Sequence, residues 1–349
     1  MLTTTEAGQT WDYSHNIGGQ HFVYPAAAGF SDGMLFVLSR AIESVPPNIN
    51  RFTKSQVVSV VRVEDHEHLG DFGAFDFTWP VDLVLDSHDN IYVSDEYQNK
   101  IAVYTGQQRV SEWGEAGGAP GALNGPAGIA FDNEDNLYVV NSLSDNVQKF
   151  TADGHFLLGW GETGTDQGQF QRAWGITIDS VGDVYVADWG NNRVQKFTPD
   201  GNYLLTFGGA KTYQYRAPTI EEVDLTGEFP GSLNHPTDVA VDGDGDVYVA
   251  DWGNGRVQIY APDGEFIATL WGDATDFSPW AQAVLDANPD VQKAWRRAVP
   301  GQFVSQSRFN RPIDVLIVDD LQLMVTETNR FRIQVYDKLH NYVAAQINL

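Results

Sequence analysis

The sequence contains no cysteine and little positive charge. Among its 349 residues, 21 are Lys or Arg and 47 are Asp or Glu, which gives a net charge of −26 at pH 7. The absence of cysteine excludes disulfide frameworks, thiolate metal sites and cysteine nucleophiles. So large a negative charge repels nucleic acids and anionic membranes, and we expect neither as a partner.

Long hydrophobic runs are absent as well. No apolar stretch approaches the roughly 18–20 residues that a membrane-spanning helix needs, and the first twenty residues contain no apolar signal-peptide core. We therefore expect a cytoplasmic protein, unless a leader has been removed. The hydrophobic content of 42% is sufficient for a buried core, which excludes a wholly disordered chain.

One pattern of about 45 residues recurs six times along the chain. Clear copies begin at Pro80, Pro126, Ala173 and Pro236, and two weaker copies begin at Pro25 and Pro312. Each copy contains short runs rich in β-branched and aromatic residues, separated by turns such as DNEDN and TADG. Four such runs form the antiparallel blade of a β-propeller, and six blades close a ring.

The copies predict a single all-β domain, a six-bladed β-propeller, over the whole chain. We place the blades at approximately 21–76, 77–122, 123–170, 171–232, 233–308 and 309–349. The last copy ends in YVAAQINL, which predicts its own fourth strand. We therefore expect this blade to be complete without the N-terminus, and residues 1–20 to pack outside the ring or across its seam.

Three insertions, at 40–56, 209–235 and 271–309, lengthen the connections of this ring. Two join one blade to the next, and the third joins the second and third strands of the first copy, so all three open at the same end of a propeller. Long loops in a compact domain are typical of functional sites. Ser278-Pro279 and Asn288-Pro289 predict two short helices. We interpret them as a lid over the central channel; the alternative is an insertion that packs on one blade.

A carboxylate ends the second strand of most copies, and a basic residue follows five positions later. Asp95, Asp188 and Asp251 could bind a divalent ion or act as acids and bases. In the third copy both positions are asparagine, Asn141 and Asn146, so the two charges disappear as a pair. This favours the alternative, in which each carboxylate contacts the basic residue of its own blade and braces a loop.

The histidines argue against a zinc site, so calcium is the more plausible divalent cofactor. His88, His155 and His340 fall in turns at the end opposite the insertions, and only His235, with His15 or His21 as further candidates, can reach the insertion end. A catalytic zinc usually needs three converging protein ligands. The segment DGDGD at 242–246 resembles part of a calcium loop, but it coincides with a hairpin turn of every copy, which favours a turn.

The residue before the first strand of each copy lies at the insertion end of the predicted ring. These residues are Tyr24, Trp79, Gly125, Arg172, His235 and Arg311. Guanidinium, imidazole and aromatic groups that converge there suit a carboxylate or other anion on an aromatic ligand. The alternative is that each arginine pairs with an aspartate of a neighbouring blade.

Two strings, VADWGNNRVQKFTPDG from Val186 and VADWGNGRVQIYAPDG from Val249, resemble NHL repeats. This resemblance implies a six-bladed propeller that serves as an enzyme or as a binding platform. A weaker resemblance is to peptidyl-α-hydroxyglycine α-amidating lyases. It implies catalytic roles for Arg40, which follows LFVLS, and for Tyr97 in VSDEYQN. That family binds zinc through histidines directly after the proline of the first strand, where this chain has Ala26, Val81, Ala127, Trp174, Thr237 and Ile313.

Together these patterns predict that the channel mouth binds and converts a small polar or anionic molecule in a lyase- or hydrolase-like reaction. Arg40, Arg172 and Arg311 would hold the anion, and Tyr97 or His235 would move a proton. Aromatic side chains would wall the site, namely Tyr24, Trp79, Trp174, Trp189 and Trp252. The competing hypothesis is a non-catalytic scaffold that presents the same face to a protein or peptide.

Overall fold

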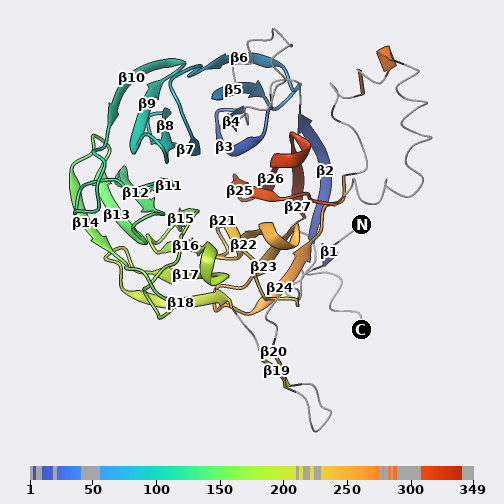
Figure 1. The fold of residues 1–349 in the computed structure, drawn as a ribbon. Coiled ribbons are helices and arrows are strands. Elements are labelled where there is room, and N and C mark those ends of the chain that lie inside the picture. The colour runs from blue at the N-terminus through green and yellow to red at the C-terminus, as the bar shows by residue number, and fades with distance from the viewer. Residues whose placement is uncertain are drawn as a thin grey trace, which may run out of the picture.

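Six antiparallel sheets surround a central axis in the computed structural model, each with one strand next to the axis (Figure 1). The structure describes residues 3–4, 10–18, 22–40, 56–209, 212–214, 221–223, 229–274, 278, 282–283, 286–288 and 308–339. This arrangement confirms the predicted all-β, six-bladed propeller. None of the helices within these ranges is long and apolar enough to cross a bilayer.

The first three blades follow one another along the chain, each from its inner to its outer strand. Blade one contains β3 (Pro25–Ser31), β4 (Met34–Arg40), β5 (Gln56–Arg62) and β6 (His68–Phe72). Blade two contains β7 (Pro80–Leu85), β8 (Asn90–Asp95), β9 (Lys100–Thr105) and β10 (Gln108–Trp113). Blade three contains β11 (Pro126–Phe131), β12 (Asn136–Asn141), β13 (Asn146–Thr151) and β14 (Phe156–Trp160).

Blades four to six carry single-turn 3-10 helices after their second strands. Blade four contains β15 (Ile176–Ile178), β16 (Val184–Asp188), η1 (Trp189–Asn191), β17 (Arg193–Phe197) and β18 (Tyr203–Gly208). Blade five contains β21 (Pro236–Val241), β22 (Val247–Asp251), η2 (Trp252–Asn254), β23 (Arg256–Tyr260) and β24 (Phe266–Leu270). Blade six contains β25 (Pro312–Val318), β26 (Gln322–Glu327), η3 (Thr328–Arg330) and β27 (Arg332–Leu339). Between blades four and five, β19 (Thr212–Gln214) pairs with β20 (Glu221–Val223).

The core lies between neighbouring blades, because each sheet packs both of its faces on another sheet. β16 and β22 are buried at every position, which explains their nearly continuous apolar sequence, VYVA. Between blades four and five, Phe207 packs with Leu233, Val249 and Tyr260 in one cluster. The repeated apolar runs of the sequence are thus the middle strands of the blades.

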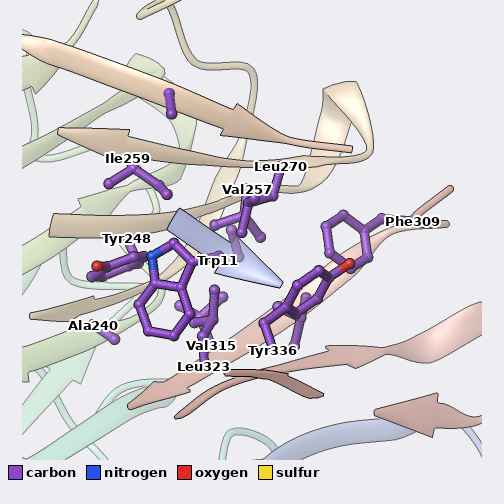
Figure 2. Packing of buried hydrophobic residues seen from close by; sticks show 13 residues of the cluster. Trp11, Ala240, Tyr248, Val257, Ile259, Leu270, Phe309, Val315, Leu323 and Tyr336 are labelled. Carbon is purple, nitrogen blue, oxygen red and sulfur yellow. The ribbon is translucent and has the colours of Figure 1, made fainter. Parts of the chain in front are cut away.

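The N-terminus closes the ring. β2 (Thr10–Gly18) pairs antiparallel with β27, and β1 (Thr3–Thr4) adds a further strand outside it. Trp11 of β2 is 1% exposed and meets Tyr248 of blade five edge-on at 5.5 Å between ring centroids. Figure 2 shows Trp11 among apolar side chains of blades five and six.

This closure corrects one prediction. We expected YVAAQINL to complete the last blade without the N-terminus, but β2 occupies the place beside β27, so of the two placements expected for residues 1–20 the described part lies across the seam. The segment 342–349 lies outside the described residues. β2 fits this place because its buried residues, Trp11 and Ile17, enter the core on both sides of blade six.

Candidate functional site

The three insertions leave the described strands at one end of the ring, as the sequence predicts. β4 ends at Arg40, and β18 and β24 end opposite the starts of β17 and β23. The inner strands begin at this same end, since Pro25 pairs with Ser39 and Pro236 with Asp251. The inserted residues, including the predicted lid helices within 278–295, lie outside the described residues except at scattered positions.

A cavity of about 260 Å³ occupies this end of the channel. Six of the residues that the sequence places in the site line it together: Arg40, Trp79, Arg172, Trp174, Trp189 and Trp252. Thr237 and Ile313 complete the described lining. The cavity is therefore walled by four indoles and carries two guanidinium groups.

The backbone of the inner strands explains why these side chains meet. In five blades the pairing of the first two strands shifts register directly after the start of the inner strand. Bulges of this kind redirect side chains and are common beside functional sites. Thr237 and Ile313 lie within such shifts, between Pro236 and Asp238 and between Pro312 and Asp314.

Four residues before the inner strands have left-handed backbone conformations, namely Tyr24, Arg172, His235 and Arg311 with φ of 52°, 50°, 53° and 58°. The preceding blade stabilises two of them, because Asp145 Oδ1 accepts the Arg172 N–H at 2.6 Å and Asn192 Oδ1 accepts the His235 N–H at 2.8 Å. Such conformations cost about 1–3 kcal/mol each and gather at ligand sites.

Arg40 is the most enclosed cation of the cavity. Its side chain is 9% exposed, and its guanidinium lies 5.1 Å from the centre of the Trp79 ring. Burial lowers the pKa of Arg40 to about 10, although the charges of Glu96 and Asp82 oppose that shift. Within the described ranges, no hydrogen bond or ion pair joins this guanidinium to a carboxylate.

Other predicted site residues lie around the cavity without lining it. Arg311 stacks on Trp252 at 4.6 Å, and the His235 ring lies 4.1 Å from that of Trp189. Burial lowers the pKa of His235, and its Nδ1 lies 2.6 Å from Asn234 Oδ1.

The two tyrosines predicted for the site do not line the cavity. Tyr24 packs edge-on against Phe331 at 4.9 Å. Tyr97 is 75% exposed. The structure thus gathers the predicted arginines, tryptophans and histidine at the mouth. Tyr97, the tyrosine predicted to act in proton transfer, does not lie in the cavity wall.

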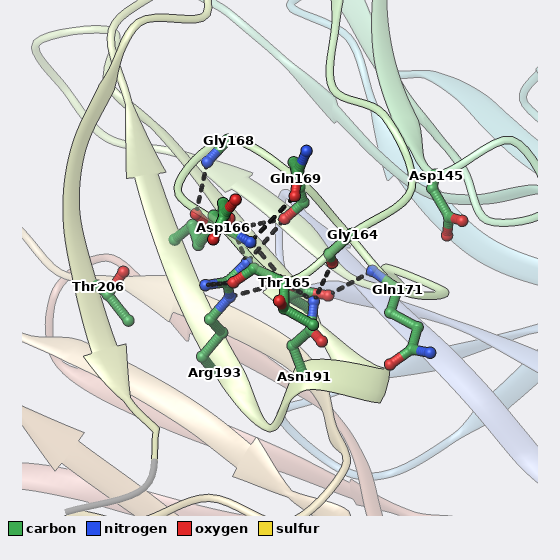
Figure 3. Close-up of polar contacts among 12 residues, drawn as sticks. Asp145, Gly164, Thr165, Asp166, Gly168, Gln169, Gln171, Asn191, Arg193 and Thr206 are labelled. Carbon is green, nitrogen blue, oxygen red and sulfur yellow. Dashed lines mark hydrogen bonds and ion pairs between the residues drawn. The ribbon is translucent and has the colours of Figure 1, made fainter.

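The predicted carboxylates Asp95, Asp188 and Asp251 do not meet. Each lies at the end of a second strand in a different blade, and no group of three metal-binding side chains occurs in the described part of the chain. Asp188 accepts the Gln171 N–H and the Arg193 Nε–H, both at 2.8 Å. Figure 3 shows Arg193 reaching on to the loop that joins blade three to blade four, where it donates to the carbonyls of Thr165, Asp166 and Gln169.

The same contact recurs in blade five and is replaced by amides in blade three. Arg256 Nε donates to Asp251 at 2.6 Å, whereas Asn141 Nδ2 donates to Asn146 Oδ1 at 3.1 Å. Burial raises the pKa of Asp251, and the Arg256 charge opposes that shift. These contacts support the loop-bracing interpretation over a shared metal site.

Blade two departs from that interpretation. Asp95 accepts the amides of Thr78 and Trp79 at 2.6 and 3.1 Å, but the Lys100 ammonium donates to the Gly114 carbonyl instead. Lysine has no fork of donors with which to bind a carboxylate and a loop together. The predicted contact between Asp95 and the basic residue of its blade is therefore absent from the described ion pairs.

The calcium-like segment 242–246 binds a side chain of its own protein. Lys338 of blade six extends its ammonium to Asp242 Oδ2 at 2.7 Å and to Asp244 Oδ2 at 2.9 Å. Burial raises the pKa of Asp246 to about 6, and the neighbouring Asp242 charge adds to this. The segment forms a hairpin turn in which one lysine pairs with two of the three aspartates.

Sequence reasoning missed three acids beneath the mouth. Asp82, Asp238 and Asp314 line a second cavity of about 10 Å³, which shares Trp174, Thr237 and Ile313 with the first. Asp82 and Asp238 each accept an amide of the next blade, from Ile129 at 2.8 Å and from Val315 at 3.0 Å. A sequence pattern could have identified these three acids. Each is the aspartate two positions after the proline that begins a first strand, in PVD, PTD and PID.

Comparison with known proteins identifies the repeats. A profile described as NHL repeat matches residues 170–197 and 233–260, which belong to blades four and five. No curated protein matches this chain significantly.

Solved structures share the fold at low sequence identity. A structural-genomics protein of unknown function from Bacteroides thetaiotaomicron VPI-5482 matches with a TM-score of 0.62 and 17% identity, over 95% of this chain and 76% of that chain. A streptogramin B lyase matches at 0.54 and 13%, over 94% and 98%. A catalytically inactive virginiamycin B lyase from Staphylococcus aureus, solved with quinupristin, matches at 0.54 and 12%, over 93% and 98%. Likeness at these identities is a likeness of fold.

Proposed function

Because this chain is a six-bladed propeller built from NHL repeats, we propose that it uses the mouth of its channel as a ligand site. The site binds a small anionic molecule and converts it in a lyase- or hydrolase-like reaction. Propellers of this kind have many functions, so the support must come from the site itself.

The observation that carries this proposal is that the Arg40 guanidinium is buried beside the cavity without a side-chain partner for its donors in the described part of the chain. A guanidinium has five donors and is always charged near neutral pH, and a buried charge usually has a partner. Arg40 is 9% exposed and stacks on Trp79, yet its donors have no partner among the described side chains. An anionic ligand in the adjoining cavity would supply those bonds.

The walls of the cavity favour a ligand with a flat apolar part. Trp79, Trp174, Trp189 and Trp252 offer indole faces around the space beside Arg40. Ligand pockets commonly combine apolar walls with a few polar groups that fix orientation. A carboxylate carried on an aromatic ring satisfies both features.

Conversion of the ligand requires a group that can take or give a proton. Burial lowers the pKa of His235, so its imidazole is neutral at pH 7 and can accept a proton. Its ring lies against Trp189 at the edge of the cavity. The fold shared with streptogramin and virginiamycin B lyases supports a lyase among the possible reactions.

Calorimetric titration with benzoate and with benzamide, its neutral analogue, tests this proposal. A hydrogen bond to a charged group contributes about 1.5–3 kcal/mol, so we expect benzoate to bind at least about tenfold more tightly. Arg40→Met should abolish that preference. The matched control is Arg62→Met, because Arg62 is partly exposed and pairs with Asp65 and Glu67. Equal affinities for the two probes in the native protein would contradict the proposal.

A protein-binding scaffold is the second candidate, and exposed apolar side chains favour it. Tyr97 and Leu143 occupy equivalent positions after β8 and β12 and are 75% and 54% exposed. Exposed apolar residues that gather on one surface are typical of interfaces. Under this hypothesis, neither benzoate nor benzamide binds measurably, and replacing Tyr97 and Leu143 with serine leaves the melting temperature unchanged.

A further inference from the structure

Two cations from different seams of the ring line the mouth cavity. Arg40 ends β4 of blade one and stacks on Trp79, which precedes blade two, whereas Arg172 precedes blade four and its N–H donates to Asp145 of blade three, so the two arginines belong to different seams of the ring. Both line the same cavity. Within the described chain, no carboxylate forms an ion pair with either guanidinium.

The space between them is apolar and limited. Indoles of Trp79, Trp174, Trp189 and Trp252 line it, and its volume is about 260 Å³. A cavity of about 150 Å³ is sufficient for benzene. The mouth therefore has room for one aromatic ring with substituents on its two sides.

The channel beneath does not admit an anion. The lower cavity measures about 10 Å³, which is at the limit for one water molecule. Burial, followed by the charge of Asp82, raises the pKa of Asp314 to about 8. Burial and the charges of Asp314 and Asp82 raise that of Asp238 as well. A further negative charge in the lower cavity is therefore unfavourable. The anionic groups of a ligand must stay in the mouth cavity, beside the arginines.

We infer that the ligand is a flat molecule with two anionic groups at opposite ends, which lies across the mouth and contacts Arg40 with one group and Arg172 with the other. This inference rests on the function proposed above and narrows its ligand class. A ligand that ran down the channel would need only one arginine and would bring its far end against the three acids.

Positional isomers of benzenedicarboxylate test the spacing without any change to the protein. We expect the 1,4-isomer to bind about tenfold or more tightly than benzoate at the same ionic strength, and the 1,2-isomer to gain little over benzoate. If the 1,4- and 1,2-isomers bind equally, only the number of charges matters, and the inference is wrong.

Variants then test which arginine binds each anionic group of the ligand. Arg172→Met should weaken binding of the 1,4-isomer and so reduce its advantage over benzoate to about twofold or less. Arg62→Met should change neither value. If benzoate binds and the 1,4-isomer binds no more tightly than benzoate, the proposed function is supported but the inference of a ligand with two anionic groups is wrong. If neither probe binds, both fall.

Discussion

Replacement of Arg256 should destabilise the propeller strongly, because the buried carboxylate of Asp251 would lose its cationic partner. Arg256 is 1% exposed and Asp251 is fully buried. The guanidinium donates to Asp251 at 2.6 Å and to the carbonyls of Phe229 and Ser232 at 3.1 and 2.8 Å. It also stacks on Trp271 at 5.4 Å. Arg256→Asn removes all of these contacts.

The expected magnitude follows from the cost of an unpaired buried charge. Removing one partner of a buried ion pair costs about 3–5 kcal/mol. Unfolding entropy is about 2.1 cal/mol/K per residue, or ~0.7 kcal/mol/K for 349 residues. Dividing the first value by the second predicts that Arg256→Asn lowers the melting temperature by about 4–7 °C.

Blade three supplies the matched control. The double variant Asp251→Asn with Arg256→Asn reproduces the pair of Asn141 and Asn146, which form their own hydrogen bond. We expect the double variant to melt higher than Arg256→Asn alone, because no charge remains unpaired. Scanning calorimetry of the three proteins measures both differences.

Two results would refute this reasoning. A change of less than about 1 °C for Arg256→Asn would show that the contact does not brace the loop. A rise in native melting temperature with millimolar calcium that Asp251→Asn abolishes would restore the metal hypothesis, since a ligand stabilises the state that binds it.

Three further predictions concern other parts of the ring. Deleting residues 1–18 removes β2 and exposes the edge of β27, so we expect a large loss of thermal stability and self-association, measured by calorimetry and size-exclusion chromatography. Gly128→Ala should destabilise by about 1–3 kcal/mol in urea titrations, because its Cβ would lie 2.4 Å from a carbonyl oxygen of blade four; Gly118→Ala, with 3.8 Å to its nearest neighbour, should not. His15 and His66 stack at 5.0 Å with their pKa lowered by burial, so the unfolded chain binds more protons. The stability that this pair contributes should be full above about pH 6.5 and lost below it. The native urea midpoint should therefore fall more between pH 7.5 and 5 than that of the His15→Gln, His66→Gln variant, and equal changes in the two proteins would contradict this.

The fold could be predicted because its signals are local and repeated. Each blade carries its own strand and turn pattern, and six copies leave little choice of architecture. The partner of β27 could not be predicted, because 10–18 and 342–349 both have strand-forming sequences. What selects β2 is the fit of Trp11 against Tyr248 of another blade, which depends on packing between distant residues.

The candidate site could be predicted only in part. Equivalent repeat positions lie at one end of a propeller, so the gathering of Arg40, Arg172 and the tryptophans follows from the repeat alignment. The outward position of Tyr97 could not be predicted from the repeat alignment, because it depends on the local path of a loop. The meeting of Asp82, Asp238 and Asp314 requires a closed ring, which brings blades two, five and six to one point.

The partnership of β2 with β27 also sets the order of events during synthesis. Gly18 and its partner Arg332 are separated by roughly 300 residues of chain. At about 5–20 residues per second of translation, β2 waits for roughly 15–60 s with Trp11 uncovered. Throughout that interval the nascent protein presents an aromatic residue on an open strand to whatever lies nearby. That segment is therefore open to non-native contacts until the final blade emerges.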